Sequence, residues 1–218
     1  MFAWFGYLVS AMAAVLTFFY GFAHNYGLAV VLLTIAVRIV IMPLYAKQMQ
    51  SMRKMQQLQP EIKKLQEKYK GDPQKLNQSQ MQLYKEYGVN PAAGCLPTLV
   101  QLPFLYALYD ALRTYNYGIH SSFLWMSTLR SPDHLLILPI LAGVSTFWQS
   151  WITSPPGTDR SQQMIILILM PAFIFYISLR LPAGLDLYWV VSNLFAVAQQ
   201  YVMIARGPMQ TAPVGPKP

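Results

Sequence analysis

Apolar residues along this chain gather into five runs, each of about 20 residues, the length that a helix needs to cross the hydrocarbon core of a bilayer. The runs cover approximately residues 27–46, 95–116, 134–153, 163–181 and 185–205. The longest polar stretch, residues 47–94, lies between the first two runs. This pattern predicts an all-α, polytopic membrane protein with five transmembrane helices.

The segment before the first run, residues 1–26, is also apolar. It has no basic residues ahead of its apolar part, as a signal peptide would, and only residues 24–26 separate it from the next run. Trp4, Tyr7 and Tyr20 suit the depth of lipid headgroups. We therefore expect an interfacial helix on the outer surface, with a sixth span as the alternative that the length of the segment permits.

Residues 47–94 are basic. They hold nine of the 16 Lys and Arg residues of the chain, namely Lys47, Arg53, Lys54, Lys63, Lys64, Lys68, Lys70, Lys75 and Lys85. Short loops rich in Lys and Arg stay on the cytoplasmic side of a membrane. The loop is therefore predicted to be cytoplasmic, and alternation of the remaining spans places the N-terminus outside and the C-terminus inside.

This basic segment carries two helical patterns. In the first, apolar side chains recur every three or four residues, as Met49, Met52, Met55, Leu58, Ile62, Leu65 and Tyr69. Gly71, Asp72 and Pro73 then supply a helix stop, an N-cap and a proline suited to the first turn of a second helix. The pattern predicts an antiparallel helical hairpin, with a kink or a new turn at Pro60 because proline removes a backbone donor.

The methionines of the first pattern have two interpretations. Methionine is flexible and polarisable, so Met49, Met52 and Met55 would offer an adaptable apolar surface that receives a client protein. A methionine stripe at helical spacing also fits the core of the hairpin itself. The basic face of the same helix would meet anionic lipid headgroups, RNA or an acidic client.

Composition narrows the chemistry further. The chain is 55% hydrophobic and 11% charged, with a formal net charge of +8, whereas soluble chains carry about a quarter charged residues. A single cysteine, Cys95, excludes an internal disulfide, and the three histidines are far apart in sequence. No phosphate-binding loop of the GxxxxGK[ST] type occurs. We therefore expect no cofactor, no metal, no nucleotide hydrolysis and no enzyme activity, and no recognition fold suggests DNA binding.

Arg38 interrupts the first apolar run. A charge at the centre of a span costs about 2.5–3.5 kcal/mol on insertion scales. One interpretation is that the long side chain snorkels toward the cytoplasmic interface. The other is that Arg38 faces a water-filled cavity in the bundle, where Thr34, one turn earlier, adds a polar group on the same face. Further polar residues available to line such a cavity are Gln101, Ser145, Gln149, Ser192 and Asn193.

No acidic partner is evident at the depth of Arg38, and an unpaired positive charge suits a transient anionic visitor. One function that follows is a small-solute or ion transporter that uses Arg38 as an anion site. Against it, the runs show no clear inverted repeat and lack buried acids suited to ion coupling. Intramembrane proteolysis is excluded because no span centre offers a histidine or paired acids.

Several strings in the chain match those of a known family. They are Asn25-Tyr26-Gly27-Leu28-Ala29, Leu33-Thr34-Ile35-Ala36-Val37-Arg38, Leu58-Gln59-Pro60, Asn90-Pro91-Ala92-Ala93-Gly94-Cys95-Leu96-Pro97, Gln101-Leu102-Pro103 and Leu187-Tyr188-Trp189-Val190-Val191-Ser192-Asn193. From about residue 25 to 206, in this order and around five spans, the chain resembles the YidC/Oxa/Alb family of membrane protein insertases.

The resemblance implies an insertase and chaperone that passes single-span or small proteins into the bilayer without nucleotide hydrolysis. Its spans would enclose a hydrophilic groove that is open to the cytoplasm and to lipid and closed on the outer side. In the family, the arginine matching Arg38 lies in this groove, and the positions matching Thr34 and Trp189 contact the client. The residues expected to form the substrate-binding groove are Arg38, Thr34, Gln101, Trp189, Ser192 and Asn193.

The expected organisation is then an outer-surface helix at 1–26, a first span at 27–46, a cytoplasmic hairpin at 47–94, spans two to five at 95–206 and a short disordered cytoplasmic tail at 207–218. The expected location is the bacterial cytoplasmic (inner) membrane. The expected partners are nascent membrane protein clients and the lipid bilayer. The ribosome and the Sec translocon stay open as partners. Docking of the tail on a ribosome is in doubt, since the tail is short and rich in Pro and Gly rather than basic.

Overall fold

The computed structural model of the chain describes residues 3–89, 96–114, 122–153 and 163–205. Within these ranges the regular structure is helical and no strand forms. The elements are α1 (Ala3–Ala23), α2 (Tyr26–Gln57), α3 (Gln59–Lys68), α4 (Pro73–Glu86), α5 (Leu96–Thr114), α6 (Ile137–Thr153), the π-helix η3 (Ile165–Leu169), α8 (Met170–Ser178) and α9 (Ala183–Ala205). The all-α prediction is confirmed for the described residues.

A helix lies over each of the five apolar runs. α2 covers the first and continues past it as a single 32-residue helix, while α5, α6 and α9 cover the second, third and fifth. η3 and α8 together cover the fourth. Within the described ranges, one helix is both long and apolar enough to cross a membrane, over Tyr26–Ser51 of α2. The count of five spans and their direction remain predictions.

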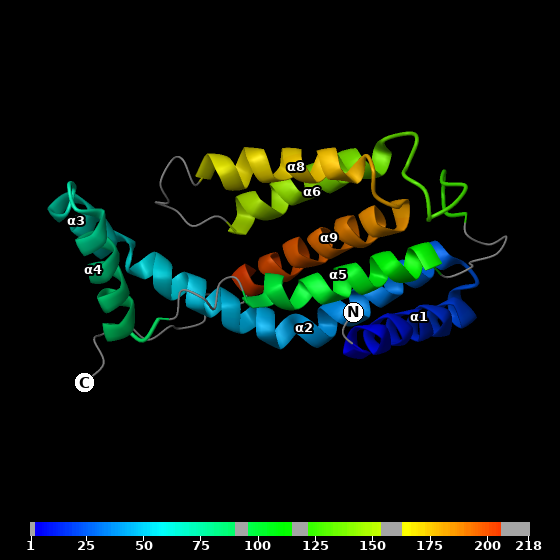
Figure 1. Cartoon of the computed structure of the whole chain (residues 1–218), viewed down its shortest axis with the longest axis horizontal. Coiled ribbons are helices and arrows are strands. Elements are labelled where there is room, and N and C mark those ends of the chain that lie inside the picture. The colour runs from blue at the N-terminus through cyan, green and yellow to red at the C-terminus, as the bar shows by residue number, and fades with distance from the viewer. Residues whose placement is uncertain (1–2, 90–95, 115–121, 154–162, 206–218) are drawn as a thin grey trace.

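The helices pack in three tiers (Figure 1). α1, α2 and α5 run side by side, α9 packs against α2, α5 and α6, and α6 pairs with α8 on the far side of α9. α3 and α4 project beyond one end of this bundle, which we call the hairpin end. Residues 122–136 lie at the opposite end, which we call the loop end. The bundle therefore has two ends built from different kinds of structure.

The main apolar core joins α1, α2, α5, α9 and the loop end. Its fully buried leucines are Leu16, Leu33, Leu108, Leu112 and Leu129. A Cβ atom at Gly184 would stand about as close to Leu112 as packing allows, 3.0 Å from its methyl groups. A glycine at that position therefore lets the start of α9 approach α5 closely.

Large apolar side chains cover the outside of the α6–α8 pair. Val144, Trp151, Ile168 and Phe173 are each more than 40% exposed. Exposed apolar surface of this extent is rare on monomeric soluble proteins. It suits contact with lipid chains, as the apolar runs of the sequence predict.

The chain reverses direction at residues 24–25, so α1 and α2 lie side by side and antiparallel (Figure 1). His24 takes a positive φ of 52°, and the Asn25 side chain caps α2 by accepting hydrogen bonds from the backbone N–H groups of Gly27 (2.9 Å) and Leu28 (3.2 Å). A short linker thus suffices for a tight reversal. This antiparallel arrangement is the one that the sixth-span alternative predicts, and the placement of α1 at the outer interface remains a prediction.

The helical hairpin begins where α2 ends. Leu58 interrupts the helix and Pro60 lies in the first turn of α3, so the predicted break at this proline is confirmed. The predicted N-cap of the second helix is also confirmed, since the Asp72 carboxylate accepts a hydrogen bond from the Lys75 backbone N–H at 3.0 Å. The hairpin has its own small core of Leu58, Ile62 and Val89, against which Met55, Leu83, Tyr84 and Tyr87 pack.

Candidate functional site

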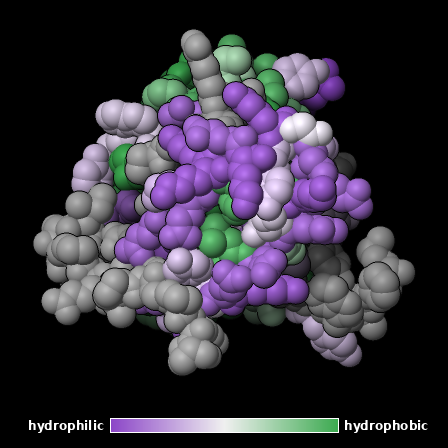
Figure 2. Space-filling model, turned by 90° about the vertical axis from the view of Figure 1, so that its left-hand side faces the viewer, coloured by the Kyte–Doolittle hydropathy of each residue, from purple (hydrophilic) through white to green (hydrophobic). Residues whose placement is uncertain are grey.

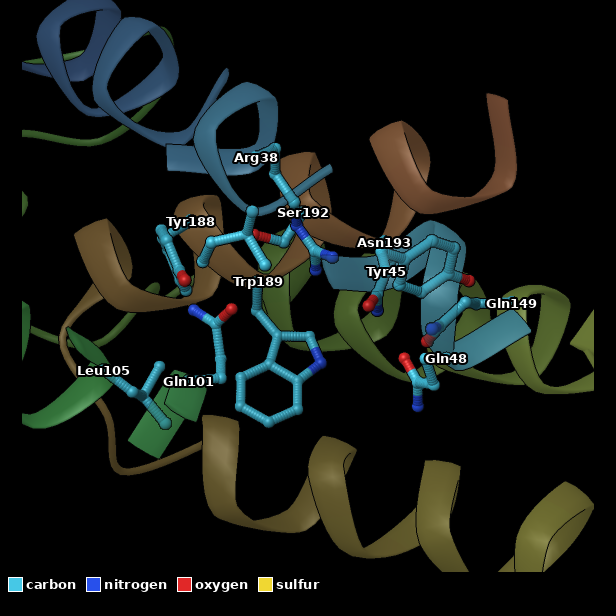
Figure 3. Close-up of a pocket in the computed structure, with 11 residues that line it drawn as sticks. Arg38, Tyr45, Gln48, Gln101, Leu105, Gln149, Tyr188, Trp189, Ser192 and Asn193 are labelled. Carbon is cyan, nitrogen blue, oxygen red and sulfur yellow. The ribbon is translucent and has the colours of Figure 1, made fainter. Parts of the chain in front are cut away.

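A polar cavity of about 210 Å³ lies among four helices of the bundle. Its lining comes from α2, α5, α6 and α9, and comprises Arg38, Ile41, Tyr45, Gln48, Gln101, Leu105, Gln149, Tyr188, Trp189, Ser192 and Asn193. Eight of these residues carry an amide, hydroxyl or guanidinium group, and the other three are Trp189 and the aliphatic Ile41 and Leu105. The close-up in Figure 3 shows the labelled side chains converging on one space. Polar groups facing one cavity inside an apolar bundle indicate a site that holds water or a polar ligand.

Arg38 supplies the positive charge of this cavity. Figure 3 shows its guanidinium pointing inward, with Tyr45 and Tyr188 on either side. The Arg38 Nε atom is buried without a hydrogen-bond partner, and Arg38 forms no ion pair with any carboxylate that the structure describes. Arg38 as a whole is half-buried, and a guanidinium that lacks an acidic partner is costly in an apolar bundle unless water or an anion reaches it. The inward-facing interpretation of Arg38 therefore fits the geometry better than snorkelling does.

Thr34 does not reach the cavity. Its side chain is 0% exposed and its hydroxyl donates to the Val30 carbonyl in its own helix, at 2.6 Å. Thr34 is therefore not among the residues that line the cavity, and its expected place in the substrate-binding groove remains a prediction. Thr34 and Arg38 share a helical face, but the core formed with α1 and α5 closes over Thr34 before the cavity begins.

The other expected groove residues come together. Gln101 from α5 and Trp189, Ser192 and Asn193 from α9 all line the cavity. The Gln101 Nε2 atom is buried without a protein partner, so it is available to donate to water or to a ligand. Whether these residues bind a client remains a prediction.

Three residues that line the cavity, Tyr45, Gln48 and Tyr188, were not predicted from the sequence. Arg38, Tyr45 and Gln48 are spaced by seven and three residues, which places them on one face of α2. Following the face of Arg38 for two turns finds Tyr45, and a third turn finds Gln48. Tyr188 adjoins Trp189 in the chain, and only the fold shows that both side chains reach the same cavity.

Behind the cavity, hydrogen bonds tie α6 to α9. The Trp189 indole Nε1–H donates to the Thr146 hydroxyl at 3.1 Å, and the Asn193 amide donates to the same hydroxyl at 2.9 Å. The Asn193 amide also donates to the Ser145 hydroxyl, at 3.1 Å. Ser145 and Thr146 are buried and do not line the cavity, so Ser145 is not the lining residue that the sequence suggested.

At the loop end the bundle is closed by packing. Met126 and Leu129 are buried in the main core. The backbone of the loop binds the start of α9, because the Ala183 N–H donates to Ser131 O at 2.9 Å and the Gly184 N–H donates to Leu129 O at 3.0 Å. The packed apolar core at the loop end therefore lies on one side of the cavity, and the hairpin end lies on the other.

Asp133 holds the loop against α6. Its carboxylate accepts hydrogen bonds from the Leu138 N–H (2.8 Å), the Trp125 indole N–H (3.1 Å) and the Leu135 N–H (3.1 Å). Burial alone would raise the pKa of the Asp133 carboxyl, but these hydrogen bonds outweigh burial and hold the pKa below its usual range. Asp133 is therefore charged at neutral pH and acts as a structural cap.

The methionines predicted to receive clients lie on the hairpin side. Met49 is buried, and Met55 packs against the small core of the hairpin. The side chain of Met52 lies outside the described residues. The placement of Met55 favours the hairpin-core alternative for that residue, and a role of the three methionines in receiving clients remains a prediction.

Residues 18–210 match the family described as 60Kd inner membrane protein. A relative in Fusobacterium nucleatum, named membrane protein insertase YidC, is 42% identical over 186 residues, which cover 85% of this chain and 89% of the relative. A relative of the same name in Anaeromyxobacter sp. is 46% identical over 189 residues, covering 87% of this chain. This chain spans only 34% of that second relative, so the relative is much longer.

A solved structure supports the same assignment. The crystal structure of an active YidC insertase with its first transmembrane domain resolved superposes with a TM-score of 0.73 at 29% identity, covering 92% of this chain and 47% of the other. The sequence match and the structural match each extend over most of this chain. The chain therefore belongs to the YidC/Oxa/Alb family of inner membrane proteins.

Proposed function

We propose that this protein is a membrane protein insertase and chaperone that passes single-span or small membrane proteins into the bilayer without nucleotide hydrolysis. One observation carries the proposal: the unpaired Arg38 faces a polar cavity, while the outside of the same bundle is apolar. The names of the relatives support it. In this proposal the chain is a multi-pass protein of the bacterial inner membrane.

The physical problem for such a protein is the polar end of its client. An apolar helix of about 20 residues gains free energy on entering lipid, but a charged residue ahead of it costs about 2.5–3.5 kcal/mol at the bilayer centre. The cavity offers water, amides and the Arg38 charge partway across. An acidic tail therefore meets a smaller barrier there than in lipid, and the apolar helix then partitions into the bilayer.

The size of the cavity limits what enters it. A volume of about 210 Å³ equals about seven molecules of liquid water. It holds a short extended stretch of a client and not a helix about 10 Å wide. The polar tail therefore passes through the cavity while the client's helix forms against lipid and the apolar side chains around the cavity.

The surface at the hairpin end fits a cytoplasmic entrance. Figure 2 shows hydrophilic residues over most of that face. The exposed lysines of α3 and α4 include Lys63, Lys64 and Lys85, and charge of this sign stays in the cytoplasm. In this proposal nascent clients approach from the hairpin end, whether delivered by a ribosome or beside the Sec translocon.

The direct test is insertion into proteoliposomes of a single-span client with an acidic N-terminal tail, scored by protease protection of that tail. Liposomes that contain this protein should protect several times more client than liposomes of the same lipid without it. Equal protection would contradict the proposal.

A second function, an anion transporter, is favoured by the same unpaired Arg38. It requires a path through the loop end, where Met126 and Leu129 are buried. Saturable anion flux in the liposomes without any client would support the transporter, and its absence together with client protection would support the insertase.

A further inference from the structure

The Trp189 indole has one polar atom, and the structure shows where that atom is engaged. Trp189 lines the cavity, and in Figure 3 its ring projects into the open space. Its Nε1–H is already engaged, because it donates to the Thr146 hydroxyl on α6 at 3.1 Å. The ring therefore offers the cavity carbon surface and no hydrogen-bond donor.

Thr146 is fully engaged in holding this arrangement. A threonine hydroxyl can donate once and accept twice. Here it donates to the Ala142 carbonyl at 2.7 Å and accepts from Trp189 Nε1 and from the Asn193 amide. The bond to Ala142 fixes the hydroxyl proton on its own helix, which leaves both lone pairs directed at α9. The threonine is 6% exposed, so water does not readily replace either bond.

Ser145 provides a built-in contrast to Thr146. Its hydroxyl donates to the same Ala142 carbonyl, at 3.2 Å, and accepts from Asn193 but not from Trp189. Both neighbouring hydroxyls therefore bind α6 to α9 by accepting hydrogen bonds, but of the two only the Thr146 hydroxyl accepts from the indole N–H.

From this geometry we propose that Thr146 is a positioning residue for client insertion: it fixes the Trp189 ring as an apolar contact surface inside an otherwise polar cavity. The proposal rests on the insertase function proposed above. Arg38 and the amides then meet the polar part of a client, and the fixed indole meets its apolar part. Without the hydroxyl, the indole N–H loses its partner and the ring turns to find another among the amides of the cavity.

The first measurement follows the indole proton itself. In protein labelled with 15N-tryptophan and held in nanodiscs, the Nε1–H resonance of Trp189 is the one that disappears in Trp189→Phe. We expect its exchange with deuterated solvent to become about tenfold faster in Thr146→Val, which keeps the shape of the side chain and removes the hydroxyl. Thr146→Ser and Ser145→Ala should both keep the slow exchange, because each retains the hydroxyl that Trp189 binds.

The second measurement follows insertion of the acidic-tailed client. Thr146→Val removes the bonds to both Trp189 and Asn193. If the bond to Trp189 is the one that matters for insertion, this variant should lower the initial rate about threefold to tenfold, the loss expected from one neutral hydrogen bond, while Thr146→Ser restores it. Ser145→Ala should stay within about twofold of wild type. In the Trp189→Phe background, which has no indole N–H, Thr146→Val should add little further loss.

Unchanged indole exchange in Thr146→Val would overturn the proposal. So would an equal loss of insertion in Ser145→Ala, since that would show a general need for α6–α9 packing. If the wild type itself inserts no client, the insertase function fails, and the indole exchange still decides whether Thr146 positions Trp189.

Discussion

The two ends of the helical bundle differ in how their buried groups are satisfied. At the loop end, buried apolar side chains and satisfied hydrogen bonds fill the space between helices, as around Leu129 and Asp133. Toward the hairpin end, Arg38 and Gln101 keep buried polar atoms without protein partners around a cavity. Packing stabilises the first region, whereas the unpartnered polar atoms of the second reduce its stability. In the function proposed here, a cavity closed at the loop end would admit the polar segment of a client without opening a pore.

The largest effect that separates the two regions should come from Leu129→Ala. Leu129 is 1% exposed, and truncating a buried leucine costs about 2–5 kcal/mol in stability. Leu135→Ala is the matched control, because Leu135 lies in the same loop but is 61% exposed. Thermal unfolding in detergent micelles should show a large drop in Tm for the first variant and almost none for the second. Equal drops would mean that the loop end is not packed as described.

Gly27→Ala should have the next largest effect. A Cβ atom at Gly27 would overlap the ring of Phe123, so the loop would have to move off α2, at a cost of about 1–3 kcal/mol. Gly21→Ala serves as the control, since a Cβ there meets nothing within 4 Å. The first variant should unfold at lower temperature and make liposomes leak small ions. A Gly27→Ala protein as stable and as tight as Gly21→Ala would contradict this contact.

Asp133→Asn should have a smaller effect that depends on pH. Asparagine keeps one acceptor oxygen where the Asp133 carboxylate offers two, so the variant loses about one hydrogen bond, at a cost of about 0.5–1.5 kcal/mol. Because the folded state lowers the pKa of Asp133, its contribution is complete above the unfolded pKa of about 4 and is lost as the pH falls through the lower folded value. The Tm difference between wild type and variant should therefore be constant near neutral pH and shrink below about pH 4. A difference that persists undiminished at pH 3 would show that the charge of Asp133 is not its source.

The sequence predicted the helices well because each depends on local information. Apolar length located α2, α5, α6 and α9, and Asp72 and Pro60 marked the ends of the hairpin helices through their own backbone chemistry. How α1 and α2 pack against each other was harder to predict. Their antiparallel packing depends on a reversal at His24 and on contacts with α5, which no local pattern encodes.

The site was only partly predictable for a related reason. The cost of a charge in an apolar run singled out Arg38, but the helical period gives the face of a residue and not the depth at which the bundle closes. On that account the sequence could not show that Thr34 is buried outside the cavity. Thr146 was missed because a threonine that binds its own helix leaves no sequence signal, and its contact with Trp189 joins residues 43 positions apart.

The central claim is that a positive charge in the cavity draws the polar tail of a client. The measurement that tests it most directly compares wild type, Arg38→Ala and Arg38→Lys at equal reconstitution, with the acidic-tailed client and with the same client carrying a neutral tail. We expect Arg38→Ala to lose most insertion of the acidic tail and little of the neutral one, and Arg38→Lys to retain both. Full insertion of the acidic tail by Arg38→Ala would contradict the claim and leave apolar capture as the mechanism.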